Sequence, residues 1–400
     1  MMRFVIVGNG VAGVTAAREL SRDGSGNSVE IYAREPYHYY PRPRLQEYLA
    51  DRIALDELYF RPTEWYEKSG ITVHLGRTVT ELDPEGSRIT LDGGEEVGYD
   101  RILLATGGRP FVPPIPGADK EGVFSYRTLD DVKVIKEKAR SSESAVVIGG
   151  GLLGLEAAKA LSALGVRVTV LEMFPYLLPR QLDSQGGQIL KSLIEETGVE
   201  VKVGAATEAI VGEESVSGVR LKDGSEIGAG LIVVSAGIRS NISLAKDAGL
   251  GVNRGVLVDE HLQTTAVNVY AAGDAAEFEG RVYGIVPAAV EQARAAAHNM
   301  LGEDVVYEGT MPSSTLKVVG IDCASIGLVH PEGDGYQELR STVDRTYTKL
   351  VLEGGRLVGA ILLGDTADVA PISRLVRKKA DVSGYVDRLL STDFDWRGLR

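Results

Sequence analysis

The feature that most constrains the fold of this chain is a strand, glycine turn, helix and strand unit that occurs twice. The first copy begins with the apolar run RFVIV, which is typical of a buried strand. Gly8, Gly10 and Gly13 follow with the spacing G-x-G-x-x-G, then a helical segment VTAARELSR and a second apolar run, VEIYA. The first glycine permits a sharp turn, the second lets a pyrophosphate approach the backbone, and the third lets helix and strand pack closely. The unit predicts a dinucleotide site at the positive end of the helix.

The second copy repeats this order farther along the chain. SAVVI precedes Gly149, Gly151 and Gly154, and the helical segment LEAAKALSALG and the strand VRVTVLE follow. A lone glycine motif is a weak signal, because many structural turns carry one. Two motifs in the full context argue against a structural turn. They predict an α/β fold with tandem Rossmann-like domains.

The last residues of the second strands distinguish the two units. Glu172 closes VRVTVLE, where a carboxylate can accept hydrogen bonds from both ribose hydroxyls of an adenosine. Met173 and Phe174 follow, so no arginine is placed to bind a 2'-phosphate, and we expect the second site to prefer NADH over NADPH. The first unit has Ala33 at the corresponding place, with Glu35 as the nearest substitute. The sequence leaves open whether Glu35 reaches the ribose.

Two further apolar runs end in residues that suit a flavin. RILLATGGRP ends its strand at Ala105, Thr106 and Gly107, and NVYAAGDAAEF ends its strand at Gly273 and Asp274. A carboxylate at such a strand end can accept a hydrogen bond from a ribityl hydroxyl. Either stretch alone would be an ordinary junction between strand and turn. Their order on the chain, together with two glycine motifs, favours a flavin site.

Composition excludes several other classes of protein. The formal charge of -13 argues against a protein that binds nucleic acid by neutralising phosphates over a broad surface. No uninterrupted apolar run is long enough to cross a bilayer, and the first residues, MMRFVIVGNG, are typical of a buried strand and not of a signal peptide. Cys323 is the one cysteine, so no disulfide can form within the chain. We therefore expect a cytoplasmic protein with neither a membrane nor a nucleic acid as partner.

With these residues in place, the chain resembles the flavoprotein reductases with two dinucleotide-binding domains, the class of glutathione reductase and ferredoxin reductase. It resembles in particular the NADH:rubredoxin oxidoreductases and the flavin-binding part of NADH-dependent nitrite reductases. The ordered motifs ATGGRP, GGGLLGLE, YAAGDAAE and STLKVVGIDCASIG carry the likeness over nearly the whole chain. The resemblance implies FAD and NADH as cofactors. It also implies hydride transfer from NADH to the flavin, followed by one-electron transfer to a small carrier protein such as rubredoxin.

The segment EPYHYYPRPRLQEYLA, residues 35–50, departs from part of that class. In the disulfide- and peroxide-reducing branches this region carries a redox cysteine, and here it has none, so the flavin is expected to be the only electron store. The pattern YYPRPRLQEYL resembles the rubredoxin and ferredoxin reductase version. The resemblance implies a rigid lid over FAD, in which Arg42 or Arg44 presents donors to cofactor oxygens. A proline-rich surface loop is the alternative.

The resemblance also implies roles for single residues. Glu156 would lie between the nicotinamide and flavin sites, and the backbone of Val79 would contact the adenine. Val286 would begin a helix whose positive end faces the pyrimidine side of the flavin. Lys317 matches a lysine near the flavin ring, although an exposed strand lysine explains it equally well. No catalytic acid or base and no metal site is expected, because the cofactors carry the chemistry. The residues expected to bind the cofactors are Gly8, Asn9, Gly10, Val11, Ala12, Gly13, Arg34, Glu35, Arg42, Arg44, Val79, Ala105, Thr106, Gly107, Gly149, Gly151, Gly154, Glu156, Glu172, Gly237, Gly273, Asp274, Val286 and Lys317.

The expected organisation is a glutathione reductase-like pair of domains followed by a small α+β domain. Residues 1–112 and 242–308 would form the FAD-binding domain, residues 113–241 the NAD-binding domain, and residues 309–400 the C-terminal domain. Within the NAD-binding domain, the segments VKVGAATEAIVG and SGVRLKDGSEIGAGLIVVSAG are expected to form short antiparallel strands around a DG turn. The protein would be a monomer or a homodimer.

The acceptor is the least constrained part of the prediction. A chain with a charge of -13 would repel an acidic carrier unless a local basic patch faces it. ISRLVRKKADV offers Arg374, Arg377, Lys378 and Lys379, of which the first three share one helical face. One hypothesis is that they help to dock the carrier, and the alternative is a solvated helix face.

Other functions stay open at this point. An NADH oxidase or peroxide-forming diaphorase would pass electrons to oxygen, although the missing redox cysteine weakens the peroxidase version. An electron-input subunit of a nitrite reductase would need a separate sirohaem partner. A regulator that binds flavin and NADH without useful turnover is a further alternative. Cys323 is expected to be a small buried apolar residue and not a redox group.

Overall fold

The computed structural model describes residues 1–318, 320–391 and 393–399, with only the backbone for residues 316–318. The described chain divides into two compact units. Unit 1 contains Met1–Leu45, Ile53–Arg109 and Ile238–Thr310, and unit 2 contains Gln46–Arg52, Pro110–Gly237 and Met311–Arg400. This division groups the C-terminal region with the nucleotide-binding region before it, and the three-domain organisation stays a prediction.

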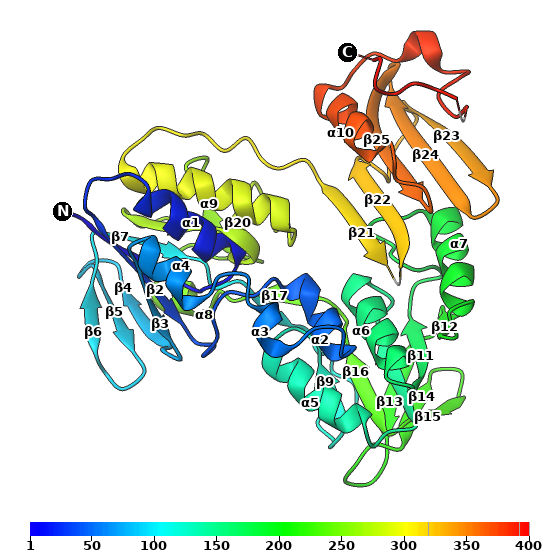
Figure 1. Ribbon diagram of the computed structural model, residues 1–400, viewed down its shortest axis with the longest axis horizontal. Helices are drawn as coiled ribbons and strands as arrows, with labels where there is room; N and C mark the ends of the chain where they lie inside the picture. The colour runs from blue at the N-terminus through cyan, green and yellow to red at the C-terminus, as the bar shows by residue number, and fades with distance from the viewer. Residues whose placement is uncertain (319, 392, 400) are drawn as a thin grey trace. The chain divides into compact units, whose positions relative to one another are not determined.

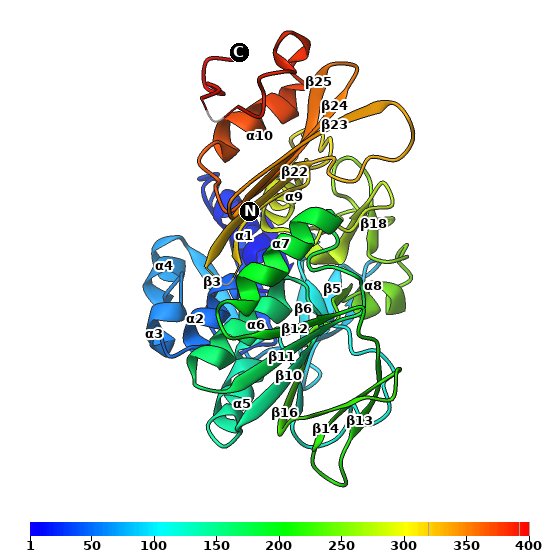
Figure 2. The same cartoon turned by 90° about the vertical axis from the view of Figure 1, so that its right-hand side faces the viewer.

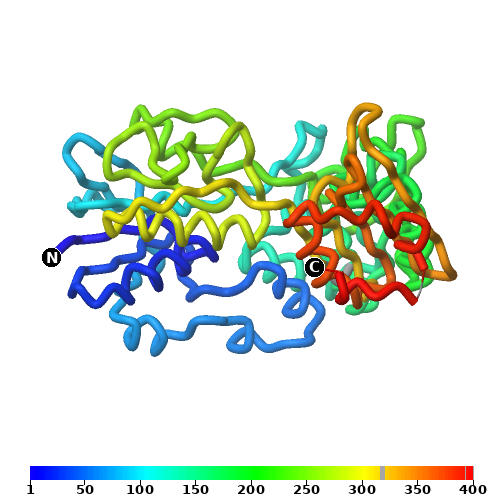
Figure 3. The backbone as a smooth tube through the Cα atoms, turned by 90° about the horizontal axis from the view of Figure 1, so that it is seen from above, coloured from blue at the N-terminus to red at the C-terminus, as the bar shows by residue number. Residues whose placement is uncertain are grey.

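Unit 1 is built on a parallel sheet with the strand order β19-β7-β1-β2-β3. Helices α1 and α9 lie side by side (Figures 1 and 3), and with one face of the sheet they form a core around Phe4, Ile6 and Ala296. The opposite face packs on an antiparallel sheet, β4-β5-β6, and on α8. Its elements are β1 Arg3–Val7, α1 Val11–Ser21, β2 Ser28–Ala33, the 3-10 turn η1 Arg42–Arg44, α3 Leu55–Leu58, α4 Thr63–Lys68, β3 Ile71–Leu75, β4 Val79–Asp83, β5 Arg88–Leu91, β6 Glu96–Gly98, β7 Arg101–Leu104, β17 Ile238–Ser240, α8 Ser243–Asp247, β18 Val256–Val258, β19 Val269–Ala271, the 3-10 turn η2 Gly273–Ala275, β20 Ala276–Phe278 and α9 Val286–Leu301.

The first part of unit 2 repeats this plan. Its parallel sheet has the order β12-β11-β10-β16-β9, of which β12, β11, β10 and β16 can be followed in Figure 2, and an antiparallel sheet β13-β14-β15 is added to it. The elements are α2 Leu45–Leu49, which begins one residue before the unit, β9 Val123–Ser125, α5 Leu129–Ala139, β10 Ser144–Ile148, α6 Leu152–Ala163, β11 Arg167–Glu172, α7 Ser184–Glu195, β12 Glu200–Val203, β13 Thr207–Val211, β14 Gly218–Leu221, β15 Glu226–Gly228 and β16 Leu231–Val234. Along the chain, strand β8, Gly108–Pro110, contains the last residues of one unit 1 segment and the first residue of the next unit 2 segment.

One sequence expectation about these strands was partly wrong. The antiparallel hairpin around the DG turn is present, but VKV and LIVV at the two ends of that stretch belong to the parallel sheet as β12 and β16. All residues of LIVV are buried. A continuous apolar run is what a parallel strand covered on both faces requires, and this pattern could have separated it from the hairpin.

The C-terminal part of unit 2 is an antiparallel sheet with the order β21-β22-β25-β24-β23. Helix α10 packs on β22 and β25 (Figures 1 and 2), and the core between them includes Leu350, Ile372 and Trp396. Within the described part of the chain, no helix has both the length and the apolar character needed to cross a membrane. The elements are β21 Ser313–Val318, β22 Ile321–Gly327, β23 Tyr336–Val343, β24 Thr346–Glu353, β25 Arg356–Leu363, α10 Val369–Lys378 and the 3-10 turn η3 Ser383–Tyr385.

Candidate functional site

The first glycine turn has the geometry that a dinucleotide requires. Gly8 has φ +117°, and a Cβ at this residue would lie 2.2 Å from the carbonyl oxygen of Ala105. A Cβ on Gly13 would lie 1.9 Å from the carbonyl oxygen of Gly8. A Cβ on Gly10, the residue that precedes α1, would meet no described atom within 4 Å. The outer glycines are therefore needed for packing, and the middle one borders open space at the helix N-terminus where a pyrophosphate of FAD would fit.

The second glycine turn has nearly the same geometry. Gly149 has φ +120°, and a Cβ there would lie 2.3 Å from the carbonyl oxygen of Ser235. A Cβ on Gly154 would lie 2.0 Å from the carbonyl oxygen of Gly149, while one on Gly151 would meet no described atom within 4 Å. Gly151 precedes α6, as Gly10 precedes α1. This turn fits the pyrophosphate of NADH on the same physical grounds.

Glu172, at the end of β11, is buried and oriented by the backbone. Its Oε2 accepts a hydrogen bond from the Gly150 amide and its Oε1 accepts one from the Phe174 amide, both at 2.8 Å. A carboxylate has about four acceptor positions, so each oxygen retains one for a ribose hydroxyl. The next side chains, Met173 and Phe174, are exposed and carry no positive charge. The arrangement suits an unphosphorylated ribose.

The corresponding strand end in unit 1 is built differently. Ala33 is buried at the end of β2, and Glu35 is half-buried beyond it. The Glu35 carboxylate accepts hydrogen bonds from the Tyr40 hydroxyl and from Arg42 Nη2, the latter at 3.1 Å. Arg44 Nη1 donates to the carbonyl oxygen of Glu57 at 2.7 Å. The lid segment is thus fixed by polar contacts within itself and with Glu57, and contacts from Arg42 or Arg44 to a cofactor stay a prediction.

A buried tyrosine that the sequence analysis missed supports the first glycine turn. The hydroxyl of Tyr66, on α4, donates to Asn9 Oδ1 at 2.9 Å and accepts from the Tyr39 amide at 3.2 Å. Burial raises the pKa of Tyr66, so the hydroxyl stays protonated. It joins the turn to the lid segment, and no local pattern in the sequence signals that long-range contact.

The remaining strand ends of unit 1 converge on the same turn. Gly8 approaches Ala105, and a Cβ on Gly273 would lie 3.0 Å from the Cβ of Ala12. The Gly273 amide donates to Oε1 of Gln292, on α9, at 2.9 Å, and this places Asp274 in the turn that follows β19. Gln292 is 1 % exposed and was missed, although a glutamine on the apolar face of a helix is a detectable signal.

The other predicted residues of unit 1 lie in several places. Thr106 and Asn241 form two hydrogen bonds with each other. Thr106 Oγ1 donates to the Asn241 carbonyl oxygen at 2.9 Å, and Asn241 Nδ2 donates to the Thr106 carbonyl oxygen at 2.8 Å. Gly107 has φ +65°, which a side chain would strain. The rest are Val11 in the first turn of α1, Arg34, which is exposed, Val79, which begins β4, and Val286, which begins α9 and is half-exposed.

Gly237 and Lys317 are the two predicted residues of unit 2 outside the glycine turn and its neighbouring acids. Gly237 has φ +107° and accepts a hydrogen bond from the Phe111 amide at its carbonyl oxygen. The side chain of Lys317 lies outside the described part of the structure, so its predicted place near the flavin stays a prediction.

Glu156, on α6, is a buried carboxyl with few polar neighbours. It is 6 % exposed, and burial raises its pKa to about 7. Nε2 of Gln46, from the segment YYPRPRLQEYL, lies 3.5 Å from Glu156 Oε1. The hydroxyl of Tyr126 is buried without a hydrogen-bond partner among the described residues, and its pKa is raised by burial and by the charge of Glu156. A carboxyl that titrates near neutral pH is typical of functional sites.

Two glycine turns on two parallel sheets define a protein with two dinucleotide-binding regions. Among the described residues, no group of three or more His, Cys, Asp or Glu side chains could hold a metal ion. Residues 2–293 match the pyridine nucleotide-disulphide oxidoreductases, and residues 312–380 match the rubredoxin NAD+ reductase C-terminal domain. The chain belongs to the pyridine nucleotide-disulphide oxidoreductase family. FAD and NADH, the expected cofactors, are those that this family uses.

Several proteins are similar to nearly the whole chain. Nitrite reductase [NAD(P)H] of Bacillus subtilis (strain 168) is 38 % identical over 95 % of this chain and 48 % of its own length. NADH-rubredoxin oxidoreductase of Clostridium acetobutylicum is 30 % identical over 98 % of this chain and 97 % of its own. Its crystal structure matches with a TM-score of 0.80 over 98 % of both chains. A ferredoxin reductase from Rhodopseudomonas palustris matches with a TM-score of 0.89 and 27 % identity over 99 % of both chains.

These matches confirm the predicted fold class and the resemblance stated from the sequence. The chain spans about half the length of the nitrite and nitrate reductase relatives, 48 %, 50 % and 47 % for three of them.

Proposed function

We propose that this chain is an FAD-dependent NADH oxidoreductase that passes electrons from NADH through FAD to a small redox protein, with rubredoxin as the first candidate. The observation that carries the proposal is the pair of glycine turns with matching geometry, of which the second is accompanied by a buried, backbone-oriented Glu172. One turn therefore suits the flavin nucleotide and the other suits NADH.

The residues of unit 1 bind and orient the flavin nucleotide in this proposal. Amides at the N-terminus of α1 bind the pyrophosphate, Asp274 accepts from a ribityl hydroxyl, and the backbone of Val79 contacts the adenine. The N-terminus of α9, at Val286, favours negative charge on the pyrimidine side of the ring. When bound, FAD supplies the chemistry, because it accepts two electrons from NADH and gives them up one at a time.

The residues of unit 2 bind NADH and exclude NADPH. Glu172 accepts hydrogen bonds from the ribose hydroxyls. Its negative charge repels a 2'-phosphate, and no neighbouring arginine compensates the charge of that phosphate. Glu156 lies beside the nicotinamide. Holding the nicotinamide and flavin in a reactive geometry is the main contribution that the protein can make to hydride transfer.

Rubredoxin is favoured as the acceptor because residues 312–380 match the C-terminal domain of rubredoxin NAD+ reductases. Arg374, Arg377 and Lys378 are exposed on α10, and Arg374 also donates to the Leu399 carbonyl at 2.8 Å. We name these three side chains the α10 patch and propose that it attracts an acidic carrier. The composition with one cysteine supports a cytoplasmic location.

A second candidate is electron input to nitrite reduction. The similarity to Nitrite reductase [NAD(P)H] of Bacillus subtilis, at 38 % identity, favours it, although that relative is about twice as long. This function requires a separate component that carries the nitrite-reducing centre.

A comparison of acceptors tests these proposals. The purified protein is expected to be yellow, to take up two electrons per chain, and to oxidise NADH faster with rubredoxin than with ferredoxin, oxygen, peroxide or nitrite-reductase components. A colourless protein that does not bind added FAD, or an uptake of four electrons per chain, would contradict the proposal. Rapid reduction by NADH followed by a long-lived complex that resists reoxidation would indicate a sensor instead of an enzyme.

A further inference from the structure

Within a few residues the chain passes from unit 1 into unit 2 and returns to unit 1. Residues Gln46–Arg52, which we name the arm, belong to unit 2, while the residues before and after them belong to unit 1. The arm contains most of helix α2 and overlaps the last residues of the lid segment. Its contacts within unit 2 are made with helices α5 and α6.

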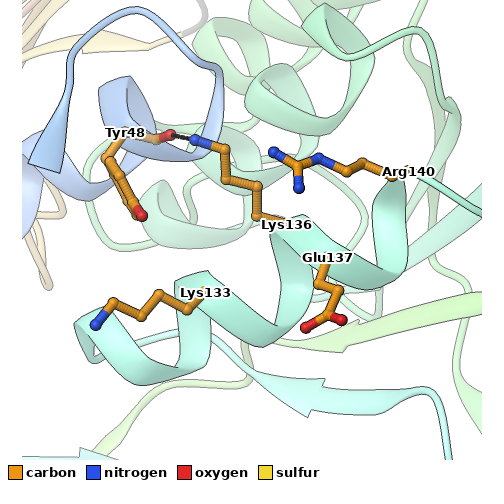
Figure 4. A pocket seen from close by; sticks show the side chains of 5 residues that line it. All are labelled: Tyr48, Lys133, Lys136, Glu137 and Arg140. Carbon is orange, nitrogen blue, oxygen red and sulfur yellow. Dashed lines mark hydrogen bonds between the residues drawn. The ribbon is translucent and has the colours of Figure 1, made fainter.

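Lys136 of α5 fixes the middle of the arm. Its Nζ donates to the carbonyl oxygen of Tyr48 at 2.7 Å, lies 2.6 Å from Asp51 Oδ1 and lies 4.2 Å from the centre of the Tyr48 ring. Figure 4 shows the side chain extending from α5 to the Tyr48 carbonyl. Lys136 is 8 % exposed, and lysine is almost never buried to this degree unless its charge has partners.

The contacts of Lys136 differ in strength. Asp51 is 55 % exposed, so water and salt screen its ion pair with Lys136. The hydrogen bond to Tyr48 and the contact with its ring are shielded by comparison, and a hydrogen bond from a charged group is stronger than one from a neutral group. The backbone of Tyr48 is therefore the point at which α5 holds the arm.

The start of the arm contacts the buried carboxyl of unit 2. Nε2 of Gln46 lies 3.5 Å from Glu156 Oε1, and Gln46 and Tyr48 belong to the same helix. Fixing Tyr48 therefore also fixes Gln46. Among the described residues, Gln46 from α2 and Tyr126 from the segment between β9 and α5 face Glu156.

We propose that Lys136 is a positioning residue for the nicotinamide side of the site, because it anchors the arm and so keeps Gln46 over Glu156. Without the anchor, the arm moves away from α5, Gln46 leaves Glu156, and water reaches the carboxyl. This inference rests on the proposed function, which places Glu156 beside the nicotinamide.

The test compares Lys136→Met with Lys138→Met in the FAD-loaded protein. Both lysines are on α5, but Lys136 lines a surface hollow of about 240 Å³ with Tyr48, whereas Lys138 Nζ lies 3.8 Å from Glu121 Oε1. Hydrogen exchange of the arm amides, measured without NADH, is expected to be about tenfold faster in Lys136→Met and unchanged in Lys138→Met. Lys136→Arg, which keeps the charge, is expected to restore most of the protection.

The second readout is the pH dependence of flavin reduction by NADH. Exposure to water lowers the apparent pKa of Glu156 from about 7, so the inflection in the profile moves to lower pH in Lys136→Met. Gln46→Leu, which leaves the anchor intact and keeps the carboxyl covered but removes the donor to Glu156 Oε1, is expected to move the inflection to higher pH while arm exchange stays as in the wild type. It therefore tests the proposal even where Lys136→Met does not fold.

The outcomes separate this inference from the proposed function. Three results would overturn the positioning role. They are hydrogen exchange of the arm in Lys136→Met at the wild-type rate, equal exchange rates in the two lysine→Met variants, and an unmoved inflection of the pH profile in Gln46→Leu. A wild-type protein that NADH does not reduce would overturn the proposed function, while the exchange comparison would still decide whether Lys136 anchors the arm.

Discussion

The two glycine turns show how one local geometry is used for two different nucleotides. Gly8 and Gly149 have φ values of +117° and +120°, and Cβ atoms on Gly13 and Gly154 would lie 1.9 and 2.0 Å from the carbonyl oxygens of Gly8 and Gly149. The turns therefore specify how closely helix, strand and pyrophosphate approach, which both cofactors need. They carry no information about which nucleotide is bound.

The difference lies in the acids around each turn. Glu172 is buried and held by two backbone amides, whereas Glu35 is partly exposed and held by Tyr40 and Arg42. Two residues after the third glycine, unit 2 has the buried Glu156 and unit 1 has Thr15. Selectivity is thus encoded in side chains next to a shared backbone, and each contrast can be tested.

Alanine at the third glycine is expected to have the largest effect and to separate the two turns. In Gly13→Ala and Gly154→Ala the new Cβ meets a backbone carbonyl that cannot rotate away, and such overpacking costs about 1–3 kcal/mol or more. Gly13→Ala is expected to lose most of its FAD. Gly154→Ala is expected to keep FAD but to bind NADH about 100-fold more weakly. Flavin absorbance and NADH titration measure these two losses.

Alanine at the middle glycine is the matched control. A Cβ on Gly10 or Gly151 meets no described atom within 4 Å, so both variants are expected to fold as the wild type does. Loss of cofactor affinity with unchanged thermal stability would then show that this space belongs to the pyrophosphate. Equal destabilisation of all four variants would contradict the comparison.

The second largest effect is expected from Glu156→Gln and concerns stability. Burial raises the pKa of Glu156 from 4.5 to about 7, so the folded protein holds this proton more tightly than the unfolded chain does. The resulting stabilisation is fully present below pH 4.5 and is lost as pH rises to about 7, and it amounts to at most about 3 kcal/mol. Relative to wild type, Glu156→Gln is expected to gain stability between pH 5 and pH 8.

Urea unfolding at these two pH values measures the effect. Thr15→Val, at the corresponding position of unit 1, is the control and is expected to leave the pH dependence unchanged. A difference between wild type and Glu156→Gln that does not vary with pH would contradict the raised pKa.

The third largest effect is expected at Glu172, the acid at the end of β11. Glu172→Ala removes a ribose acceptor and leaves the Gly150 and Phe174 amides without their partner, which costs about 1–2 kcal/mol. We expect KM for NADH to rise about tenfold, with unchanged FAD content and little change in kcat. Glu35→Ala is expected to change FAD affinity less, because its carboxylate is bound by side chains near the surface. The reverse order of effects would contradict the assignment of the turns.

Local patterns in the sequence predicted the parts of the site that depend on local geometry. The spacing of Gly8, Gly10 and Gly13 defines a turn because each glycine acts on its immediate surroundings. The supports of the site are contacts between distant parts of the chain, such as Tyr66 with Asn9, Gln292 with Gly273, and Lys136 with the arm. Neither periodicity nor spacing indicates which distant group such a side chain will meet, so these residues required the structure.

A smaller effect is expected from charge reversal in the α10 patch. Arg377→Glu combined with Lys378→Glu replaces two exposed positive charges and is expected to slow association with rubredoxin about two- to tenfold at low salt. The difference from wild type should shrink as salt screens the interaction. Lys222→Glu, an exposed reversal away from α10, controls for net charge. Unchanged carrier kinetics and unchanged salt dependence would show that the patch is a solvated helix face.

The smallest effect on electron transfer is expected at Cys323. If both redox steps belong to the cofactors held by the two turns, the one thiol of the chain stores no electrons. Cys323 is fully buried in β22, and burial raises its pKa to about 12, so the reactive thiolate is almost absent at neutral pH. Cys323→Ser is expected to keep the wild-type rate of reduction by NADH and an uptake of two electrons per chain. An uptake that falls from four electrons in the wild type to two in the variant would instead place a second redox centre at this thiol.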